Sequence, residues 1–284
     1  MRPWVATLAL IAVTVVWGAT FVVVRSAIAV YGVLPFLAVR FVIAAVVAAL
    51  LWGKLLRRDT LVVGGRIGLV LALGYLFQTW GLKHTTATNA GLITGLFVVF
   101  GPLADRALYG THLPRRAWIS VALSLVGLAL LVGRAPADLA IGDLLTLVCA
   151  LAFGLQIALL ARHAREHDAR GLGAAQMFSS GAVFLLIWPL AGEIAMPPRE
   201  VWFALVLTGV AASALAYAIQ TAAQRHLSSA RTAVILTLEP VFAGIFGYAL
   251  AGDRLGPVQL LGAGLILGAV TVSEIVPALR SRQP

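Results

Sequence analysis

Residues 4–24 read WVATLALIAVTVVWGATFVVV and contain no charged side chain. About 20 apolar residues in an α-helix cross the hydrocarbon core of a bilayer. The start of the chain, Met1-Arg2-Pro3 followed by this run, also resembles a signal peptide. The run is long for a signal peptide, however, and further apolar runs follow it directly. We therefore interpret residues 4–24 as a first membrane-spanning helix and keep signal cleavage as the alternative.

Similar apolar segments recur along the whole chain. Hydrophobic residues make up 61% of the 284 positions and charged residues 11%, whereas soluble domains have about 45–50% and ~25%. In hydrocarbon every backbone N–H and C=O must be bonded within its segment, which favours helices, and the alternation typical of a barrel is absent. The sequence predicts an all-α integral membrane protein with ten transmembrane helices, at residues 4–24, 34–52, 64–82, 88–109, 116–133, 142–162, 172–190, 201–222, 230–250 and 257–276.

The net charge of +10 is distributed in short basic clusters between apolar runs, such as Arg57-Arg58 and Arg115-Arg116. This pattern is typical of cytoplasmic loops and argues against a nucleic-acid partner. With the N-terminus inside, 15 of the 21 Lys and Arg residues face the cytoplasm. The other six are Arg25, Arg40, Lys83, Arg134, Arg199 and Arg254. We therefore predict a multi-pass protein of the bacterial inner (plasma) membrane with both termini in the cytoplasm.

The two halves of the chain resemble each other. An offset of 142 aligns Tyr75-Leu-Phe-Gln78-Thr79 with Tyr217-Ala-Ile-Gln220-Thr221, and an offset of 136 pairs Gly18 with Gly154 and Arg40 with Gln176. Five helices per half is an odd number, so the second copy enters the membrane from the opposite side. We predict two inverted five-helix repeats, residues 1–136 and 137–284, an architecture that recurs in secondary transporters.

Several short motifs, in this order and spacing, resemble the drug/metabolite transporter (DMT) superfamily and in particular its ten-span EamA family. They are Trp17-Gly-Ala-Thr20-Phe21, the stretch from Gly81 to Ala90, Glu239-Pro240-Val-Phe, Gly252-Asp253-Arg254-Leu255 and Gly262-Ala-Gly264-Leu-Ile-Leu-Gly268. The resemblance covers nearly the whole chain. One departure is that Gly110-Thr111 and Gly252-Asp253 stand where the family often has Gly-Glu, which weakens any gating role for those positions.

The resemblance implies a secondary transporter of small metabolites, often an exporter of amino acids, including aromatic ones. The superfamily also contains carriers of nucleotide sugars, triose phosphates, purines and drugs, so the substrate stays open. We expect no cofactor; the partners are the lipid bilayer, a small-molecule substrate and, where transport is coupled, protons. Monomer and dimer both remain open. A channel or a membrane-embedded enzyme is less favoured, because no repeated filter sequence and no clustered acids or nucleophile–base pair are evident.

The repeated polar residues are the first candidates for a substrate cavity. Polar side chains within a span are costly unless they have partners or line a water-filled space. Gln78 and Gln220 occupy equivalent places in the two halves, each one turn after a tyrosine, Tyr75 or Tyr217. Thr79 belongs to the same set. An amide can meet a carboxylate or an ammonium group. The alternative is hydrogen bonding between helices, worth about 0.6 kcal/mol on average in membranes.

Further candidates stand alone in their spans. Gln156 and Gln176 are additional amides, and Trp17 lies in mid-span, either facing the cavity or packing in the core. Glu239 is an acid near the middle of a span. Because low dielectric disfavours its charged form, it could exchange protons, bind a substrate amine, or be a neutral group bonded to another helix.

Two residues nearer the span ends are candidates for an anion site or a gate. Arg40 either snorkels to the outer interface, which we prefer, or faces the cavity as a site for a carboxylate. Asn89 either caps the helix that follows or contacts substrate. His84 and His226 lack the neighbours that a metal site needs, so we predict no metal and no catalytic residue.

Overall fold

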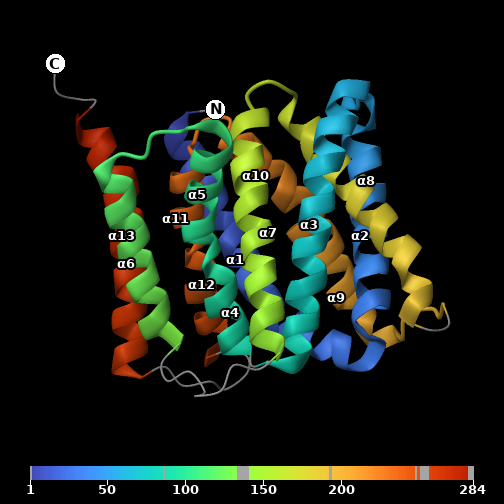
Figure 1. The fold of residues 1–284 in the computed structure, drawn as a ribbon. Coiled ribbons are helices and arrows are strands. Elements are labelled where there is room, and N and C mark those ends of the chain that lie inside the picture. The colour runs from blue at the N-terminus through green and yellow to red at the C-terminus, as the bar shows by residue number, and fades with distance from the viewer. Residues whose placement is uncertain are drawn as a thin grey trace.

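The protein folds into a bundle of helices that run side by side along one axis (Figure 1). The computed structural model describes residues 2–85, 87–132, 141–191, 194–246, 248–249 and 256–280, and these contain helices and turns but no strand. The longer helices are α1 (Pro3–Tyr31), α2 (Val33–Trp52), α3 (Arg58–His84), α6 (Arg115–Val132), α7 (Ile141–His163), α8 (Ala169–Ile187) and α13 (Pro257–Arg280). Short 3-10 turns, η1 (Gly53–Leu55), η2 (Trp188–Ala191) and η3 (Arg199–Val201), lie between helices.

Seven segments of the described chain are long and apolar enough to cross a membrane. They are Pro3–Tyr31, Val33–Leu55, Arg58–His84, Ile141–His163, Ala169–Ala191, Arg199–Gln224 and Ser229–Phe246. Large apolar side chains lie on the outside of the bundle, with Leu50 81% and Leu186 79% exposed, as expected of a surface that faces lipid. The chain is thus a multi-pass membrane protein. The helix over 88–109 is interrupted, and those over 116–133 and 257–276 adjoin residues outside the described ranges, so the number ten remains a prediction.

Two predicted helices are each broken into two pieces. Residues 87–109 form α4 (Ala87–Gly95) and α5 (Phe97–Tyr109), with the break at Leu96. Residues 229–246 form α11 (Ser229–Leu236) and α12 (Leu238–Phe246), with the break at Thr237. Pro240 has no N–H to donate to the carbonyl four residues earlier, which weakens the helix at this point. The Thr237 hydroxyl also donates to the backbone carbonyl of Val234 at 2.6 Å.

The predicted helix over 201–222 contains a wide turn. It begins as α9 (Trp202–Val206), continues as a π-helix, η4 (Leu207–Leu215), and ends as α10 (Ala216–Gln224). A π-helix bonds each residue five positions along and often marks a functional site. The small residues of Leu207–Leu215 gave no sign of this departure, since they also suit an ordinary helix.

Two pairs of helices approach one another closely enough to require glycine. A Cβ added at Gly18 in α1 would lie 2.7 Å from Phe242 Cβ in α12, and one at Gly154 in α7 would lie 2.6 Å from Phe100 Cβ in α5. These contacts bring the broken helices against α1 and α7, and so position the residues at the two breaks near the centre of the bundle.

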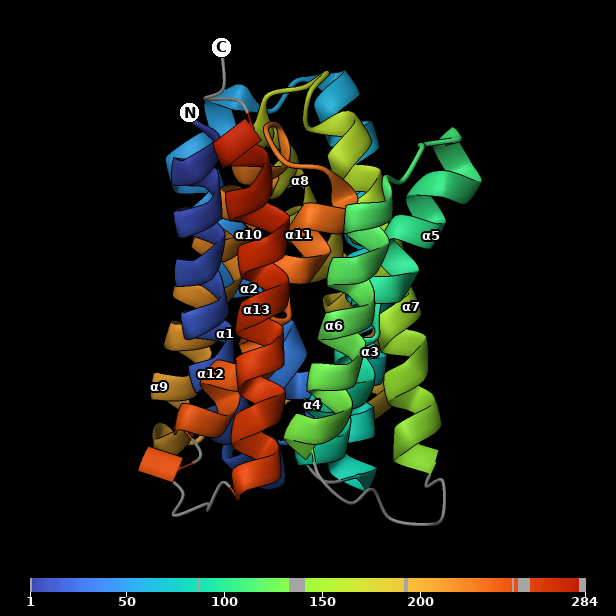
Figure 2. The same cartoon turned by 90° about the vertical axis from the view of Figure 1, so that its left-hand side faces the viewer.

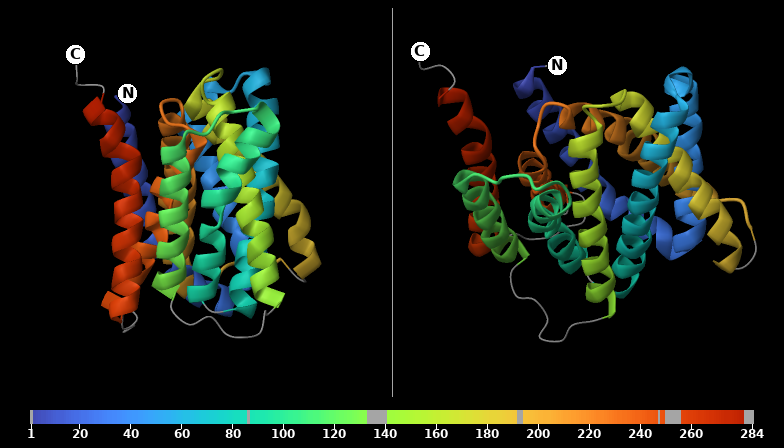
Figure 3. Two further views of the ribbon diagram at one scale, coloured as in Figure 1. Left: turned by 60° about the vertical axis from the view of Figure 1, so that its left-hand side comes forward. Right: turned by 45° about the horizontal axis from the view of Figure 1, so that its top comes forward.

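The remaining arrangement is shown by the other views. Helices α6 and α13 pack together at the edge of the bundle (Figures 2 and 3). The start of α1 and the end of α13 lie at the same end of the molecule, at the top in Figure 1. The predicted boundary between residues 136 and 137, and the motif Gly252-Asp253-Arg254-Leu255, lie outside the described residues.

Candidate functional site

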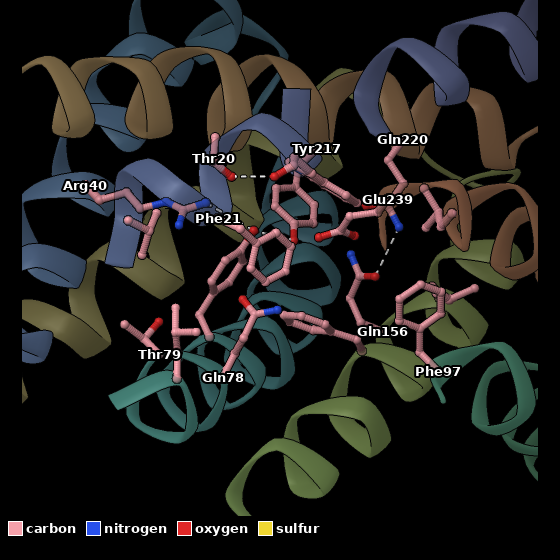
Figure 4. Close-up of a pocket in the computed structure, with 17 residues that line it drawn as sticks. Thr20, Phe21, Arg40, Gln78, Thr79, Phe97, Gln156, Tyr217, Gln220 and Glu239 are labelled. Carbon is pink, nitrogen blue, oxygen red and sulfur yellow. Dashed lines mark hydrogen bonds between the residues drawn. The ribbon is translucent and has the colours of Figure 1, made fainter. Parts of the chain in front are cut away.

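A cavity lies at the centre of the bundle, between α1, α2, α3, α5, α7, α10, α11 and α12 (Figure 4). Nine of the residues singled out from the sequence line it: Trp17, Arg40, Tyr75, Gln78, Thr79, Gln156, Tyr217, Gln220 and Glu239. The structure therefore brings together residues from six helices, while their role in binding remains a prediction.

Two tyrosines meet at the middle of the cavity wall. The Tyr217 hydroxyl donates to the Tyr75 hydroxyl at 2.9 Å. Each tyrosine also packs against an aromatic ring, Trp17 against Tyr217 and Phe153 against Tyr75, both with ring centroids 5.3 Å apart. The four residues are equivalent in pairs under the offsets of 142 and 136 found in the sequence. Each of the two aromatic contacts thus joins one residue from positions 1–136 with one from positions 137–284.

Arg40 lies inside the protein, and the interpretation that it snorkels to the membrane interface is wrong. Arg40 is only 4% exposed. Its Nε donates to the Ser213 hydroxyl at 2.9 Å and its Nη2 to the Tyr75 hydroxyl at 3.2 Å, and the guanidinium carbon stands 4.5 Å from the Tyr75 ring centroid. These partners replace water for part of the charge, which is why the side chain can remain buried.

The π-helix η4 supplies partners to two cavity residues. The Trp17 Nε1–H donates to the carbonyl of Ala212 at 2.8 Å, and the next residue, Ser213, accepts from Arg40. Trp17 therefore both packs against its neighbours and lines the cavity, so the two alternatives for it are not exclusive. The irregular turn of η4 is what presents these consecutive groups toward α1 and α2.

Glu239 stands at the start of α12, just after the break at Thr237, and is 9% exposed. Its carboxyl and the Arg40 guanidinium point into the cavity from opposite sides (Figure 4). No ion pair within 4.0 Å joins Arg40 and Glu239, and no hydrogen bond to the described residues engages the Glu239 carboxyl. The guanidinium of Arg40 and the carboxyl of Glu239 therefore face one small space without contact.

Four glutamines form a hydrogen-bonded row beside the cavity. At one end Gln224 Nε2 donates to the carbonyl of Ile157, and at the other Gln176 Nε2 donates to the carbonyl of Leu172. These backbone acceptors fix which end of each amide is the donor. Gln156 Nε2 then donates to Gln176 Oε1, and Gln220 Nε2 donates to both Gln156 Oε1 and Gln224 Oε1.

One acceptor is left over by this row. Gln220 Oε1 is buried and has no hydrogen-bond partner among the described residues. A buried acceptor without a partner costs about 1–3 kcal/mol. Because Gln220 lines the cavity, a ligand that carries an N–H group could supply the missing donor.

The other predicted residues take different places. Gln78 and Thr79 line the cavity from α3. Gln176 does not line the cavity, but its Oε1 accepts a hydrogen bond from Gln156 Nε2 at 3.0 Å. Asn89 lies in α4, and its side chain is outside the described residues.

Several lining residues were missed from the sequence. Most are apolar, and an apolar side chain in a membrane helix carries no signal of facing a cavity: Phe21, Val24, Leu82, Phe97, Phe153, Ile157 and Leu236. Thr20 was quoted only within a motif. A signal did exist for Phe97, because it is the equivalent of Glu239 under the offset of 142. Gln224, which belongs to the glutamine row but does not line the cavity, also had a signal, because it follows Gln220 by one helical turn.

A polar cavity enclosed by membrane-spanning helices is the construction of a membrane transport protein. Comparison with known proteins agrees. The sequence profile of the EamA-like transporter family matches residues 4–133 and 140–274, and the chain belongs to this family. The resemblance noted from the sequence motifs is thereby confirmed.

Relatives and a solved structure extend this result. An uncharacterized transporter of Archaeoglobus fulgidus is 37% identical over 273 residues, covering 95% of this chain and 86% of the relative. YedA of Escherichia coli K12, described as an uncharacterized inner membrane transporter, is 26% identical over 97% of this chain and 92% of its own length. A protein of known crystal structure superposes with a TM-score of 0.80 at 19% identity over the whole of both chains, which supports the fold alone.

Proposed function

We propose that the protein is a secondary transporter that exports small metabolites, chiefly amino acids with aromatic or other hydrophobic side chains, by alternating access. The observation that carries this proposal is the central cavity, into which the Arg40 guanidinium and the Glu239 carboxyl point from opposite sides, beside a group of aromatic rings. A zwitterion with an apolar side chain has a complementary distribution of charge and surface.

Each part of such a substrate has a partner of suitable chemistry. Arg40 uses two of its five N–H groups on Ser213 and Tyr75, which leaves donors for a carboxylate. The Glu239 carboxyl and Gln220 Oε1 can accept from an ammonium group. The rings of the cavity, including Phe21, Phe97 and Phe153, offer contact for an aromatic or aliphatic side chain.

The transport cycle that we propose rests on ten spans in two inverted repeats, residues 1–136 and 137–284. Two kinds of contact recur between equivalent residues and support this proposal. Gly18 packs on Phe242 as Gly154 packs on Phe100. Trp17 packs on Tyr217 as Phe153 packs on Tyr75. The family profile also matches two ranges, 4–133 and 140–274. Two similar packings that exchange between the halves give two states, one open to each side.

The shape of the cavity fits one of these states. It extends along α1 from Trp17 to Val24 and along α3 from Tyr75 to Leu82, toward the side that the Lys and Arg count assigns to the exterior. The glutamine row lies beside it and reaches toward the other end at Gln224. We infer an outward-facing state of a bacterial inner-membrane protein whose termini are cytoplasmic. The description of the E. coli relative as an inner membrane transporter supports that location.

Other metabolite classes are the main alternative. Arg40 could also hold the phosphate of a sugar phosphate, and the amides could bind a nucleoside or a drug. A membrane enzyme is less supported, since the matching relatives are described as transporters.

Reconstituted vesicles test the proposal. Counterflow is measured for a panel of amino acids, nucleosides and sugar phosphates, with and without a pH gradient, and with protein-free vesicles as the control. We expect aromatic and branched amino acids to exchange most rapidly. Inactivity with every amino acid, or faster exchange of another class, would reject the proposed substrate.

The same vesicles separate two roles for Glu239. If Glu239 exchanges protons, Glu239→Gln should abolish accumulation driven by a pH gradient while exchange of substrate continues. If Glu239 binds the substrate amine, the variant should instead weaken binding with and without the gradient. Unchanged affinity and unchanged accumulation would exclude both roles.

A further inference from the structure

A second group of titratable side chains lies outside the cavity, at the turn between α7 and α8. Residues 163–167 read His-Ala-Arg-Glu-His, and the turn is at the end of the bundle where α1 begins (Figure 1). The backbone N–H groups of Glu166 and His167 both donate to the carbonyl of His163, at 3.1 and 3.2 Å. The turn thus keeps the spacing of a helix, which puts the three side chains on one face.

The side chains of this group are close enough to share one ion. One imidazole nitrogen from each histidine and one carboxylate oxygen of Glu166 lie within 4.8 Å of one another. His163 Nδ1 stands 3.3 Å from Glu166 Oε2, yet it is buried and its contact is not aligned as a hydrogen bond. Two ligands held at ~2.0–2.1 Å from a tetrahedral zinc ion are separated by about 3.3 Å. This pair therefore already has the spacing of neighbouring ligands.

Neighbouring groups orient both kinds of ligand. Arg162 Nε stands 3.2 Å from Glu166 Oε1, so it holds one carboxylate oxygen while the other faces His163. His167 Nδ1 stands 3.2 Å from the carbonyl of His163. When this nitrogen carries the proton, it donates to the carbonyl and leaves Nε2 with the lone pair that a metal needs. Metal-binding histidines are commonly anchored in this way.

We propose that His163, Glu166 and His167 bind a divalent transition-metal ion of the Zn²⁺ class. Two imidazoles and one carboxylate are a suitable donor set for such an ion, and water would complete the coordination of three protein ligands. The site is independent of the proposed transport function, because none of its residues lines the central cavity.

Metal titration of the purified full chain tests the site. The protein, without an affinity tag that contains histidine, is treated with a chelator and titrated with Zn²⁺ by calorimetry and with Co²⁺ by visible absorption. We expect one equivalent to bind. Glu166→Gln and His163→Ala should each weaken binding by more than about tenfold, since even outer-shell partners of a metal site contribute ~10–100-fold.

The matched control is His226→Ala, which removes a histidine from another turn, between α10 and α11. His226 belongs to no such group in the described part of the chain, so this variant should bind Zn²⁺ as the wild type does. Binding that is absent in the wild type, or equal in the wild type and Glu166→Gln, would overturn the proposal. Because Glu166 is half-exposed, this variant tests the site even if His163→Ala does not fold.

Discussion

Gln220 occupies the position where the polar wall of the cavity lacks a donor. Its amide N–H groups donate to the side-chain oxygens of Gln156 and Gln224, and its own Oε1 accepts no hydrogen bond from the described residues. Gln78, its equivalent in the first half, makes no hydrogen bond to the described residues and faces the same space. The two amides are therefore alike in sequence but different in their surroundings.

This difference predicts two distinct effects of substitution by leucine. Gln78→Leu should lower transport by about tenfold, the loss of roughly 1.4 kcal/mol of binding, without changing thermal unfolding. Gln220→Leu should lower both the transport rate and the temperature of thermal unfolding. The reason is that it also leaves the Gln156 and Gln224 side-chain oxygens without a donor, at a cost of ~1–3 kcal/mol each. Counterflow and thermal unfolding in detergent measure the two effects.

Gln259→Leu, on α13 and away from the cavity, is the control for this pair and should keep wild-type transport. Unchanged transport by Gln78→Leu would reject its place in the substrate site.

For single residues, the sequence indicated which polar side chains to consider, because polar groups inside a membrane helix are energetically costly and therefore few. It could not predict the side to which Arg40 turns. That depends on Ser213 and Tyr75, which lie 173 and 35 residues away along the chain. Nor could it predict that Gln176 would stand behind Gln156 and not in the cavity wall.

Among the helices, the contact between α7 and α5 is the one that most directly fixes the cavity. Gly154 lies two residues before Gln156, and the α5 backbone at Phe100 and Gly101 packs on it. A side chain at this position would push α5 and the lining residue Phe97 away from α7.

We therefore expect Gly154→Ala to destabilise the protein by about 1–3 kcal/mol, the usual cost of an added methyl group in a packed contact. The matched control is Gly264→Ala in α13, where nothing lies within 4 Å of the added carbon. That change should be neutral or stabilise the helix by up to ~1 kcal/mol. Thermal unfolding of both variants in one detergent decides the point; equal behaviour would contradict the proposed packing role.

Helix positions followed from the sequence more directly than helix continuity did. Long apolar runs must be helical in a membrane, so α1, α2, α3, α7 and α8 were expected. Pro240 predicted a break near Thr237, and Pro102 predicted a kink in the helix over 88–109. The position of that break, at Leu96, six residues before Pro102, and the π-helix η4 were not predicted. Both depend on which neighbouring helix offers partners to the freed backbone groups, and this information is spread over the whole chain.

For the whole molecule, the distribution of Lys and Arg predicts which end faces the cytoplasm. The chain is convenient for a direct test because its single cysteine, Cys149, is fully buried. Arg57, in the turn before α3, and Met196, in the turn after η2, are both well exposed. They lie on opposite sides of the membrane in the predicted orientation.

A membrane-impermeant maleimide should label Met196→Cys on intact cells and Arg57→Cys only after the membrane is opened. The wild type, in which Cys149 is the sole thiol, should remain unlabelled in both conditions. The reverse pattern for the two variants would invert the orientation.

The helical, membrane-spanning character of the chain was thus accessible from composition alone, and the family followed from the order of short motifs. The substrate was not, because it depends on how a few polar atoms are shared. The same apolar helices could surround a cavity with different free donors and acceptors.

The π-helix η4 has one more consequence. Each residue in a π-helix turns the chain about the helix axis by a smaller angle than in an α-helix. The side chains of α10 therefore point in directions that differ from those expected if α9 continued as an α-helix. A helical wheel drawn at one constant angle through residues 202–224 would therefore assign Tyr217 and Gln220 to the wrong direction. The directions of these two side chains relative to α9 are therefore set by the wide turn as well as by their own positions in α10.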